Sequence, residues 1–225
     1  MANKNKNILD QVDIDKEIRS ASLEEREINF RGKVLSSFSL QEKIIERSLD
    51  LETAIILGPI SLEGTIIKGD LNLNDAVIRG PFYFGSGILK GDLSLENTRI
   101  NGVINLVGAR ISGNLKCNGL NISGFISLAK AEIKRNIIAK NIKINDAYHT
   151  GLVVKGDFYL KNGSVWGNFD LEKSFIEGSL DMRESSIGGE INLKSINIKE
   201  KLILKNIETK SRPQLANSQI NEVIK

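Results

Sequence analysis

The sequence predicts an all-β fold, a single right-handed parallel β-helix of about eight coils with 22 residues in each. The first observation is a glycine-led unit of 11 residues that recurs through most of the chain. The second is that outward positions match best at a separation of 22 residues, and the third is that no helical period explains the apolar positions. The glycines that lead these units are Gly58, Gly69, Gly80, Gly91, Gly102, Gly113, Gly124, Gly156, Gly167, Gly178 and Gly189.

Each unit is expected to form two short strands and two corners. Apolar residues two positions apart, such as Leu71 and Leu73, face the same way from one strand. The next apolar residues, Ala76 and Ile78, follow after a longer spacing, which leaves room for the chain to turn inward again. A glycine before each strand suits either a positive φ or a close approach of two backbones.

A full coil takes two units. Proline follows glycine at residues 58–59 and 80–81, and Lys-Gly-Asp occurs at residues 68–70 and 90–92, both 22 residues apart. Asp70 and Asp92 should therefore be neighbours on adjacent coils, in a ladder that hydrogen-bonds the corners. Eight four-sided coils would form a rod ~38 Å long, and their crossovers favour a right-handed path. The ladder comprises Asp70, Asp92, Asn114, Asn136 and Asp157.

The chain divides into a cap at residues 1–35, partly helical or disordered, a β-helix at 36–209 and a C-terminal tail at 210–225. The ends need cover because the terminal coil of a β-helix has unpaired backbone groups. Ser22 to Glu25 has the spacing of a capping box for a short helix. The tail offers one or two amphipathic turns, which could cap the rod or dock on a second subunit. The residues that could pack on the first coil are Ile8, Leu9, Val12, Ile14 and Ile18.

One coil is irregular. Two units between Arg135 and Gly156 span 21 residues, so one residue is missing, and we place the deletion within 145–151. A bulging loop on a rigid solenoid is a common recognition site, and aromatic residues are favoured anchors. The simpler interpretation, which we favour, is a tolerated deletion with no role. The candidate contact residues around it are Tyr148, His149, Tyr159 and Trp166.

The charge pattern indicates a solvated surface. There are 31 Lys and Arg residues against 28 Asp and Glu, a net charge of +3, and the charges are interspersed rather than gathered. This argues against nucleic acid as a partner. The polar first 20 residues contain no signal peptide, no segment has the length of a spanning helix, and Cys117 is the single cysteine. We therefore expect a cytoplasmic protein in a reducing compartment.

The small inward residue two places before a large one, as in Ala76 and Ile78 or Ala109 and Ile111, resembles the A-D/N-L-x-x motif of pentapeptide-repeat proteins. The resemblance covers roughly residues 36–209, although every second side here carries a sixth residue. It implies a right-handed four-sided β-helix that dimerises end to end through an uncapped terminus. That family's mimicry of DNA toward topoisomerases requires a strongly acidic surface, which this chain does not have. A second resemblance, to the polymer-forming bactofilins, fits less well because their coils are triangular.

The sequence argues against catalysis, and no cofactor or metal is expected. His149 is the single histidine, so a His-rich metal site cannot form, and its place in the irregular segment predicts exposure to solvent. Cys117 replaces an inward leucine and should be a small buried hydrophobe. Asp70 and Asp92 could perform acid–base chemistry, but corner hydrogen bonds are the expected role of these carboxylates.

Some outward positions that should be polar are apolar instead. We name Ile44, Ile66 and Ile88 the first stripe, and Ile55, Val77 and the adjacent Leu57 the second stripe. Exposed stripes of this kind usually mark contact surfaces. Alternatively, the N-terminal segment folds back over one of them. With their flanking cations, the stripes could also rest peripherally on an anionic membrane.

These observations predict a non-enzymatic protein-interaction or scaffold module that forms a homodimer or a larger self-assembly and binds an unknown protein partner. One alternative is a polymer-forming, bactofilin-like structural element joined coil to coil. Another is a carboxylate-based β-helix enzyme acting on polysaccharide.

Overall fold

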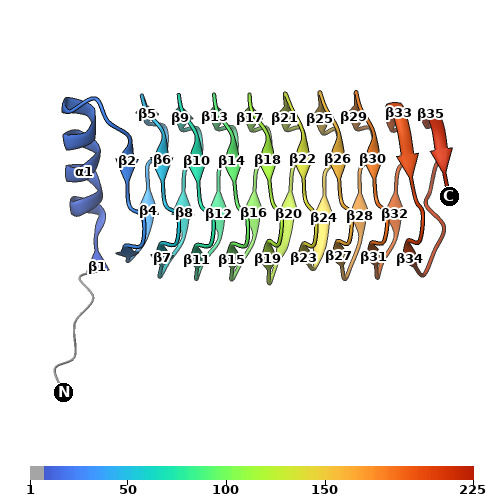
Figure 1. Ribbon diagram of the computed structural model, residues 1–225, viewed down its shortest axis with the longest axis horizontal. Helices are drawn as coiled ribbons and strands as arrows, with labels where there is room; N and C mark the ends of the chain where they lie inside the picture. Colours follow the sequence, from blue (N-terminus) through green and yellow to red (C-terminus); the bar gives the residue numbers. More distant parts are fainter. Residues whose placement is uncertain (1–7) are drawn as a thin grey trace, which may run out of the picture.

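Most strands pair in parallel with the strands 22 residues before and after them, as Leu71 does with Leu49 and Leu93. The computed structural model describes residues 8–225, and it shows these short strands stacked into one rod (Figure 1). The fold class is confirmed as a parallel β-solenoid with coils of about 22 residues. It has about ten turns instead of the expected eight, because one side alone carries ten strands.

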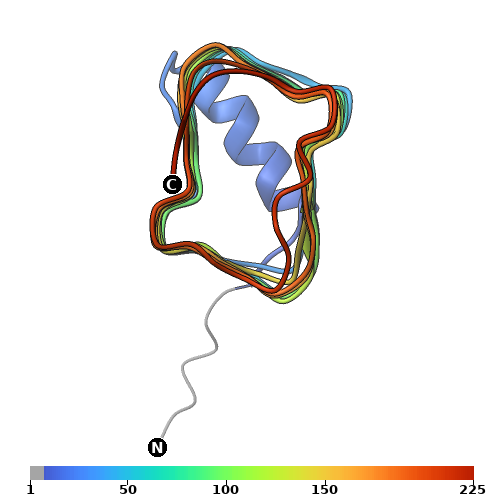
Figure 2. The ribbon, with the colours of Figure 1, turned by 90° about the vertical axis from the view of Figure 1, so that its right-hand side faces the viewer.

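Each coil has four sides, which we call A, B, C and D in chain order, and Figure 2 shows this outline along the rod. Side A is the ten-stranded sheet: β1 (Ile8–Leu9), β3 (Val34–Leu35), β7 (Ile55–Ile56), β11 (Val77–Ile78), β15 (Arg99–Ile100), β19 (Asn121–Ile122), β23 (Lys143–Ile144), β27 (Ser164–Val165), β31 (Ser186–Ile187) and β34 (Glu208–Thr209). Side B is the eight-stranded sheet: β4 (Phe38–Ser39), β8 (Ile60–Ser61), β12 (Phe82–Tyr83), β16 (Ile104–Asn105), β20 (Phe125–Ser127), β24 (Asp146–Tyr148), β28 (Phe169–Asp170) and β32 (Ile191–Asn192).

Sides C and D form one 17-stranded sheet, because the long strands β33 (Asn197–Ile203) and β35 (Gln219–Ile224) run along both. Side C holds β5 (Ile44–Ile45), β9 (Ile66–Ile67), β13 (Ile88–Leu89), β17 (Arg110–Ile111), β21 (Glu132–Ile133), β25 (Val153–Val154) and β29 (Phe175–Ile176). Side D holds β2 (Ile28–Asn29), β6 (Leu49–Asp50), β10 (Leu71–Asn72), β14 (Leu93–Ser94), β18 (Leu115–Lys116), β22 (Ile137–Ile138), β26 (Phe158–Tyr159) and β30 (Leu180–Asp181).

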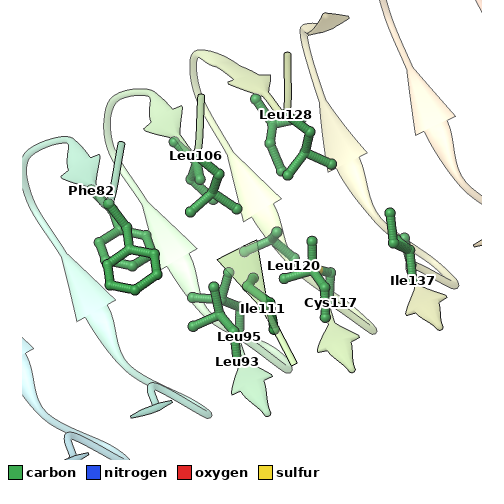
Figure 3. Close-up of a cluster of buried hydrophobic side chains, with 14 of the residues drawn as sticks. Phe82, Leu93, Leu95, Leu106, Ile111, Cys117, Leu120, Leu128 and Ile137 are labelled. Atoms are coloured by element: carbon green, nitrogen blue, oxygen red, sulfur yellow. The ribbon is translucent and has the colours of Figure 1, made fainter. Parts of the chain in front are cut away.

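The core fills the space between the four sides. Inward residues two positions apart, such as Leu93 and Leu95, are fully buried, and Leu93 stacks on Leu71 and Leu115 of the adjacent coils. Figure 3 shows these side chains meeting from facing walls, with Phe82 and Leu106 on side B and Leu93 on side D. Burial of this kind stabilises by about 1.5–3 kcal/mol for each large side chain. Stability therefore comes from coil stacking on coil.

The repeat glycines serve close approach rather than a positive φ. A Cβ on Gly91 would lie 2.7 Å from the carbonyl oxygen of Gly69 on the preceding coil. The left-handed turn positions fall elsewhere in the repeat, and residues such as Asp75 (φ 57°) and Asn97 (φ 55°) occupy them. Both types tolerate this conformation better than most side chains do.

The predicted ladder along one corner is confirmed. Asp70 Oδ1 accepts a hydrogen bond from the backbone N–H of Asp92 at 2.7 Å, and Asp92 Oδ1 accepts one from Asn114 at 2.7 Å. Asn136 and Asp157 continue the series, with bonds of 3.2 and 2.9 Å. Each side chain thus binds the backbone one coil further along, which ties consecutive coils together at the corner.

Helix α1 (Gln11–Leu23) lies across the first coil and covers its interior (Figures 1 and 2). Its N-cap is Asp10, which forms a capping box with Asp13, so the capping box predicted at residues 22–25 is wrong and those residues lie where the helix ends. Ile14, a residue of this helix, is fully buried. Of the other residues expected to pack there, Leu9 and Ile18 contact the core, whereas Ile8 and Val12 are more than half exposed.

The boundaries of the solenoid are wider than 36–209. Strands β2 and β3 already belong to it, and residues 1–7 of the expected cap lie outside the described residues. At the other end, the segment 210–225 is not a helical tail, because β35 pairs in parallel with β33. A bridge between Asn192 and Gln214 continues side B as well. The solenoid therefore extends through residue 224.

The missing residue falls at the corner between sides A and B. Asn121 pairs with Lys143, 22 residues on, but Phe125 pairs with Asp146, 21 residues on. Asn145 takes the corner position of Gly124, so nothing occupies the column of Ser123. The Asn145 side-chain N–H donates to the Ser123 carbonyl across the empty position. The segment after it forms β24 and is not a bulging loop.

Candidate contact surfaces

The first stripe lies on the outer face of side C. Ile44 pairs with Ile66 and Ile66 with Ile88, so the three side chains stack on successive coils as predicted. Ile44 is 59% exposed and the other two are half-buried. The column becomes charged at the next coil, where Ile88 pairs with Arg110. The stripe is therefore a bounded apolar surface over three coils.

The second stripe lies on side A. Ile55 pairs with Val77, and Leu57 lies beside them, all three half-buried. Val34 precedes Ile55 in the same column, and Arg99 follows Val77. The two stripes thus face different directions, and both end at arginines in the same part of the rod.

The described part of the N-terminal segment does not lie over either stripe. Helix α1 packs against β1, β2 and β4 at the end of the rod, and β1 extends side A by pairing with β3. Ile18 and Ile44 line a shallow hollow of about 60 Å³ at the helix edge. Within residues 8–225, the first stripe is therefore open beyond Ile44.

Charged residues flank the first stripe on side C. Lys68 Nζ lies 2.7 Å from Glu46 on the preceding coil, and both side chains are more than half exposed. Lys90 occupies the same column one coil further. Exposed pairs of this kind contribute little to stability, but they leave one edge of the stripe acidic at Glu46 and basic at Lys68 and Lys90.

The three aromatic candidates around the irregular coil do not converge. Tyr148 lies on side B (39% exposed), Tyr159 on side D, and Trp166 at the corner of sides A and B (71% exposed). Tyr159 is held locally, since its hydroxyl donates to Asp157 Oδ2 at 2.7 Å. This hydrogen bond and burial raise the pKa of Tyr159 to about 12. Tyr159 is therefore part of the corner structure.

His149 is buried, so its predicted exposure is wrong and it offers no contact surface. The short corner shifts the register, which places His149 on an inward position of side B between Phe158 (6.2 Å) and Phe169 (5.8 Å, ring centroids). Its Nδ1 has no hydrogen-bond partner in the described part of the chain. Burial lowers the pKa of His149 to about 3, so the ring is neutral at ordinary pH.

The space around His149 arises from small residues on the facing wall. Cys117 and Ala139 occupy the inward column of side D where Leu95 and Leu160 stand on neighbouring coils. They leave a cavity of about 20 Å³, room for about one water molecule. Cys117 is buried as predicted, and burial raises the pKa of its thiol well above the ordinary value.

Asp70 and Asp92 are engaged in corner hydrogen bonds. Burial alone would raise the pKa of Asp92, but the Lys116 ammonium at 2.6 Å and the Asn114 N–H outweigh it and hold that pKa below its usual range. Such a carboxylate stays ionised and is a poor proton donor. Among residues 8–225, no group of three or more His, Cys, Asp or Glu side chains could hold a metal ion.

One apolar surface was missed in the sequence. Phe125 on side B is 40% exposed, and its ring contacts Tyr148 at 5.7 Å. Val107, one coil earlier and at the opposite end of side B, is also exposed. The signal was available, because Phe125 immediately follows the corner glycine Gly124, at an outward position that Pro59 and Pro81 hold on earlier coils.

Searches of family models, of curated proteins and of solved structures all end without a match to this chain. What the structure shows is a parallel β-solenoid with coils of about 22 residues. In the described range, no helix has the length and apolar character needed to cross a membrane. Fold and surface together define a parallel β-solenoid that carries two apolar stripes.

Proposed function

We propose that this protein is a non-enzymatic interaction module that pairs with a second copy of itself through the first stripe and so acts as a rigid scaffold. The register of Ile44, Ile66 and Ile88 carries the proposal, because it aligns three apolar side chains on a face whose adjacent outward column is charged. Apolar patches rimmed by polar residues typically mark protein contacts.

Charge favours a second copy as the partner. In a two-fold interface the same surface meets itself in opposite directions. If Ile66 lies on the axis, the coil of Ile44 faces the coil of Ile88 in the other copy. Glu46 of each copy would then lie opposite Lys90 of the other copy, which makes two such pairs in the dimer. The opposite charges at the two ends of this column therefore favour antiparallel self-association, while Lys68 of each copy lies near the axis and is paired with Glu46 of its own chain.

Changing Ile66→Lys and Ile88→Lys together should convert a dimer into a monomer. Two ammonium groups from each copy, four in all, would be desolvated in the interface, and we expect the dissociation constant of the dimer to rise at least ~100-fold. The coil should remain folded because both side chains point outward. Light scattering after size-exclusion chromatography, at several concentrations, measures the mass.

The matched control is Val107→Lys with Phe125→Lys, which introduces the same charges on side B. This variant should keep the mass of the unmodified protein. An unmodified protein that is monomeric at all concentrations, or a stripe variant of unchanged mass, would show that the first stripe is not the interface.

A second candidate, a polymer joined coil to coil, is favoured by the last described coil. Its inward residues Leu215 and Val223 are 36% and 39% exposed, whereas Leu193 and Leu202 on the preceding coil are fully buried. The outer edge of β35 has no strand partner among residues 8–225. However, α1 covers the other end, so growth in both directions requires that helix to move.

Concentration separates the two candidates. A polymer should grow in mass without limit as the concentration rises, and Val223→Lys should stop the growth because it places a charge in the end contact. A dimer formed through the first stripe should stop at two copies and should not respond to Val223→Lys. A dimer that responds only to Val223→Lys would move the interface to the last coil.

A further inference from the structure

The corner with the missing residue contains a notch of about 490 Å³. On side A, the column that contains Asn101 and Ser123 has no residue in the next coil and resumes at Trp166. The notch therefore occupies an empty position between Ser123 and Trp166. Its remaining lining comes from Asn121, Lys143, Asn145 and the backbone of the two buried isoleucines beside them.

Trp166 forms one end of the notch. Its side chain is 71% exposed, the highest exposure of any large aromatic residue in the described chain. An indole exposed to this degree leaves a flat apolar surface in water, which is unfavourable unless a ligand covers it. The backbone beneath the ring is held by the coil, because the Trp166 backbone N–H donates to the Ile144 carbonyl at 3.0 Å.

The rest of the notch is polar. The side chains of Asn121 and Lys143 have no hydrogen-bond or ion-pair partner within residues 8–225. The Asn145 side-chain N–H is used on the Ser123 carbonyl, which leaves its Oδ1 available. Around the indole there are consequently free donors and free acceptors at neighbouring positions, with one cationic group.

We propose that this notch binds a saccharide, with one sugar ring stacked on Trp166 and its hydroxyls bonded to Asn121, Asn145 and Lys143. A pyranose ring has an apolar C–H face and a rim of hydroxyls that both donate and accept, which matches an indole bordered by amides. A protein anchor would instead be surrounded by contacts that exclude water. A nucleic-acid strand would need a row of cations, and the notch offers one.

Trp166 is the only tryptophan in the chain, so its fluorescence reports directly on the notch. The probes are the hexasaccharides of β-1,4-glucose, β-1,4-N-acetylglucosamine and α-1,4-glucose. We expect at least one of them to shift the emission, with a dissociation constant on the order of 1 mM or lower. Calorimetry then measures the same binding in variants that lack the indole.

Trp166→Ala should weaken binding at least ~10-fold without loss of folding, because the side chain is mostly in solvent. Trp166→Phe should retain part of the affinity. Phe125→Ala is the matched control, since it removes another exposed aromatic ring at the same corner on side B. Insertion of a serine between Ile144 and Asn145 should restore a 22-residue coil, fill the empty position and abolish binding.

The proposal is overturned if none of the three hexasaccharides alters the Trp166 emission or gives a calorimetric signal at sugar concentrations well above the expected dissociation constant. It is also overturned if Trp166→Ala binds as well as the unmodified protein. Binding of a ten-residue thymidine oligonucleotide in place of the sugars would assign the notch to nucleic acid. None of these outcomes depends on the oligomeric state, so they are separate from the test of the first stripe.

Discussion

His149→Leu will stabilise the protein, and the gain will grow as the pH falls. The imidazole lies in an apolar lumen with Nδ1 unpartnered in the described structure, and such a buried group costs about 1–3 kcal/mol. Leucine already occupies the same inward column on neighbouring coils, at Leu128 and Leu171. The substitution therefore replaces an unsatisfied polar ring by the side chain that the column otherwise uses.

The pH dependence follows from the lowered pKa of His149. In the unfolded chain the ring takes up a proton as the pH falls below about 6.5, whereas in the folded protein burial delays protonation to about pH 3. The unfolded state therefore binds more protons between these values, and folding stability is lost as the pH falls through this window. The loss is about 1.4 kcal/mol per pH unit.

Urea denaturation of both proteins, at pH values from 7.5 to about 4, measures this difference. Carboxylates titrate in both proteins, so subtracting the two free energies of unfolding isolates His149. The control is Thr98→Val, because Thr98 is equally buried but its hydroxyl donates to the Leu73 carbonyl at 2.7 Å. That variant should lose about 1 kcal/mol at every pH. Parallel stability curves for the unmodified protein and His149→Leu would contradict the prediction.

The coil length could be predicted because stacking repeats the same environment at every turn. Asp70 and Asp92 bind the backbone one coil further on, so both positions require a side chain of the same kind. The repeat glycines follow from the same cause, since adjacent coils leave no room for a Cβ at that corner. A periodic sequence therefore records the winding directly.

The burial of His149 was missed because the deletion was placed across seven residues. Once Asn145 is the short corner, Ala147 takes the inward position of Ile126, and His149 takes that of Leu128. The alternation of inward residues in this coil is therefore sufficient to predict that His149 is buried. The notch beside Trp166 could not be predicted in the same way, because it depends on which column is left empty.

The two ends were the weakest part of the prediction. The spacings of Ile220, Val223 and Ile224 fit one face of a helix. In the structure they belong to β35, whose pairing with β33 shifts register between Ile198 and Lys201, so the inward residues do not alternate regularly. At the other end, an aspartate with a second aspartate three residues later caps α1. Local patterns are ambiguous where the periodic environment stops, because tertiary contacts then decide the structure.

The largest loss of stability is expected from Gly91→Ala. The new Cβ would contact Asp70 Oδ1 and lie 2.7 Å from the Gly69 carbonyl oxygen, which is backbone and cannot swing away. Overpacking of this kind costs about 1–3 kcal/mol. Loss of the bond from the Asp92 N–H to the Asp70 carboxylate would add about 1.5–3 kcal/mol. Urea denaturation followed by circular dichroism gives the total.

Gly85→Ala is the matched control, because the nearest atom to its new Cβ is the Val107 carbonyl oxygen at 3.6 Å. Its effect should lie between zero and a gain of about 1 kcal/mol, since alanine restricts the unfolded chain. A combined Asp70→Ala and Gly91→Ala variant separates the two causes of the loss. It relieves the side-chain contact but keeps the backbone clash, so only part of the stability should return. Equal losses for Gly85→Ala and Gly91→Ala would contradict close coil approach as the reason for the repeat glycines.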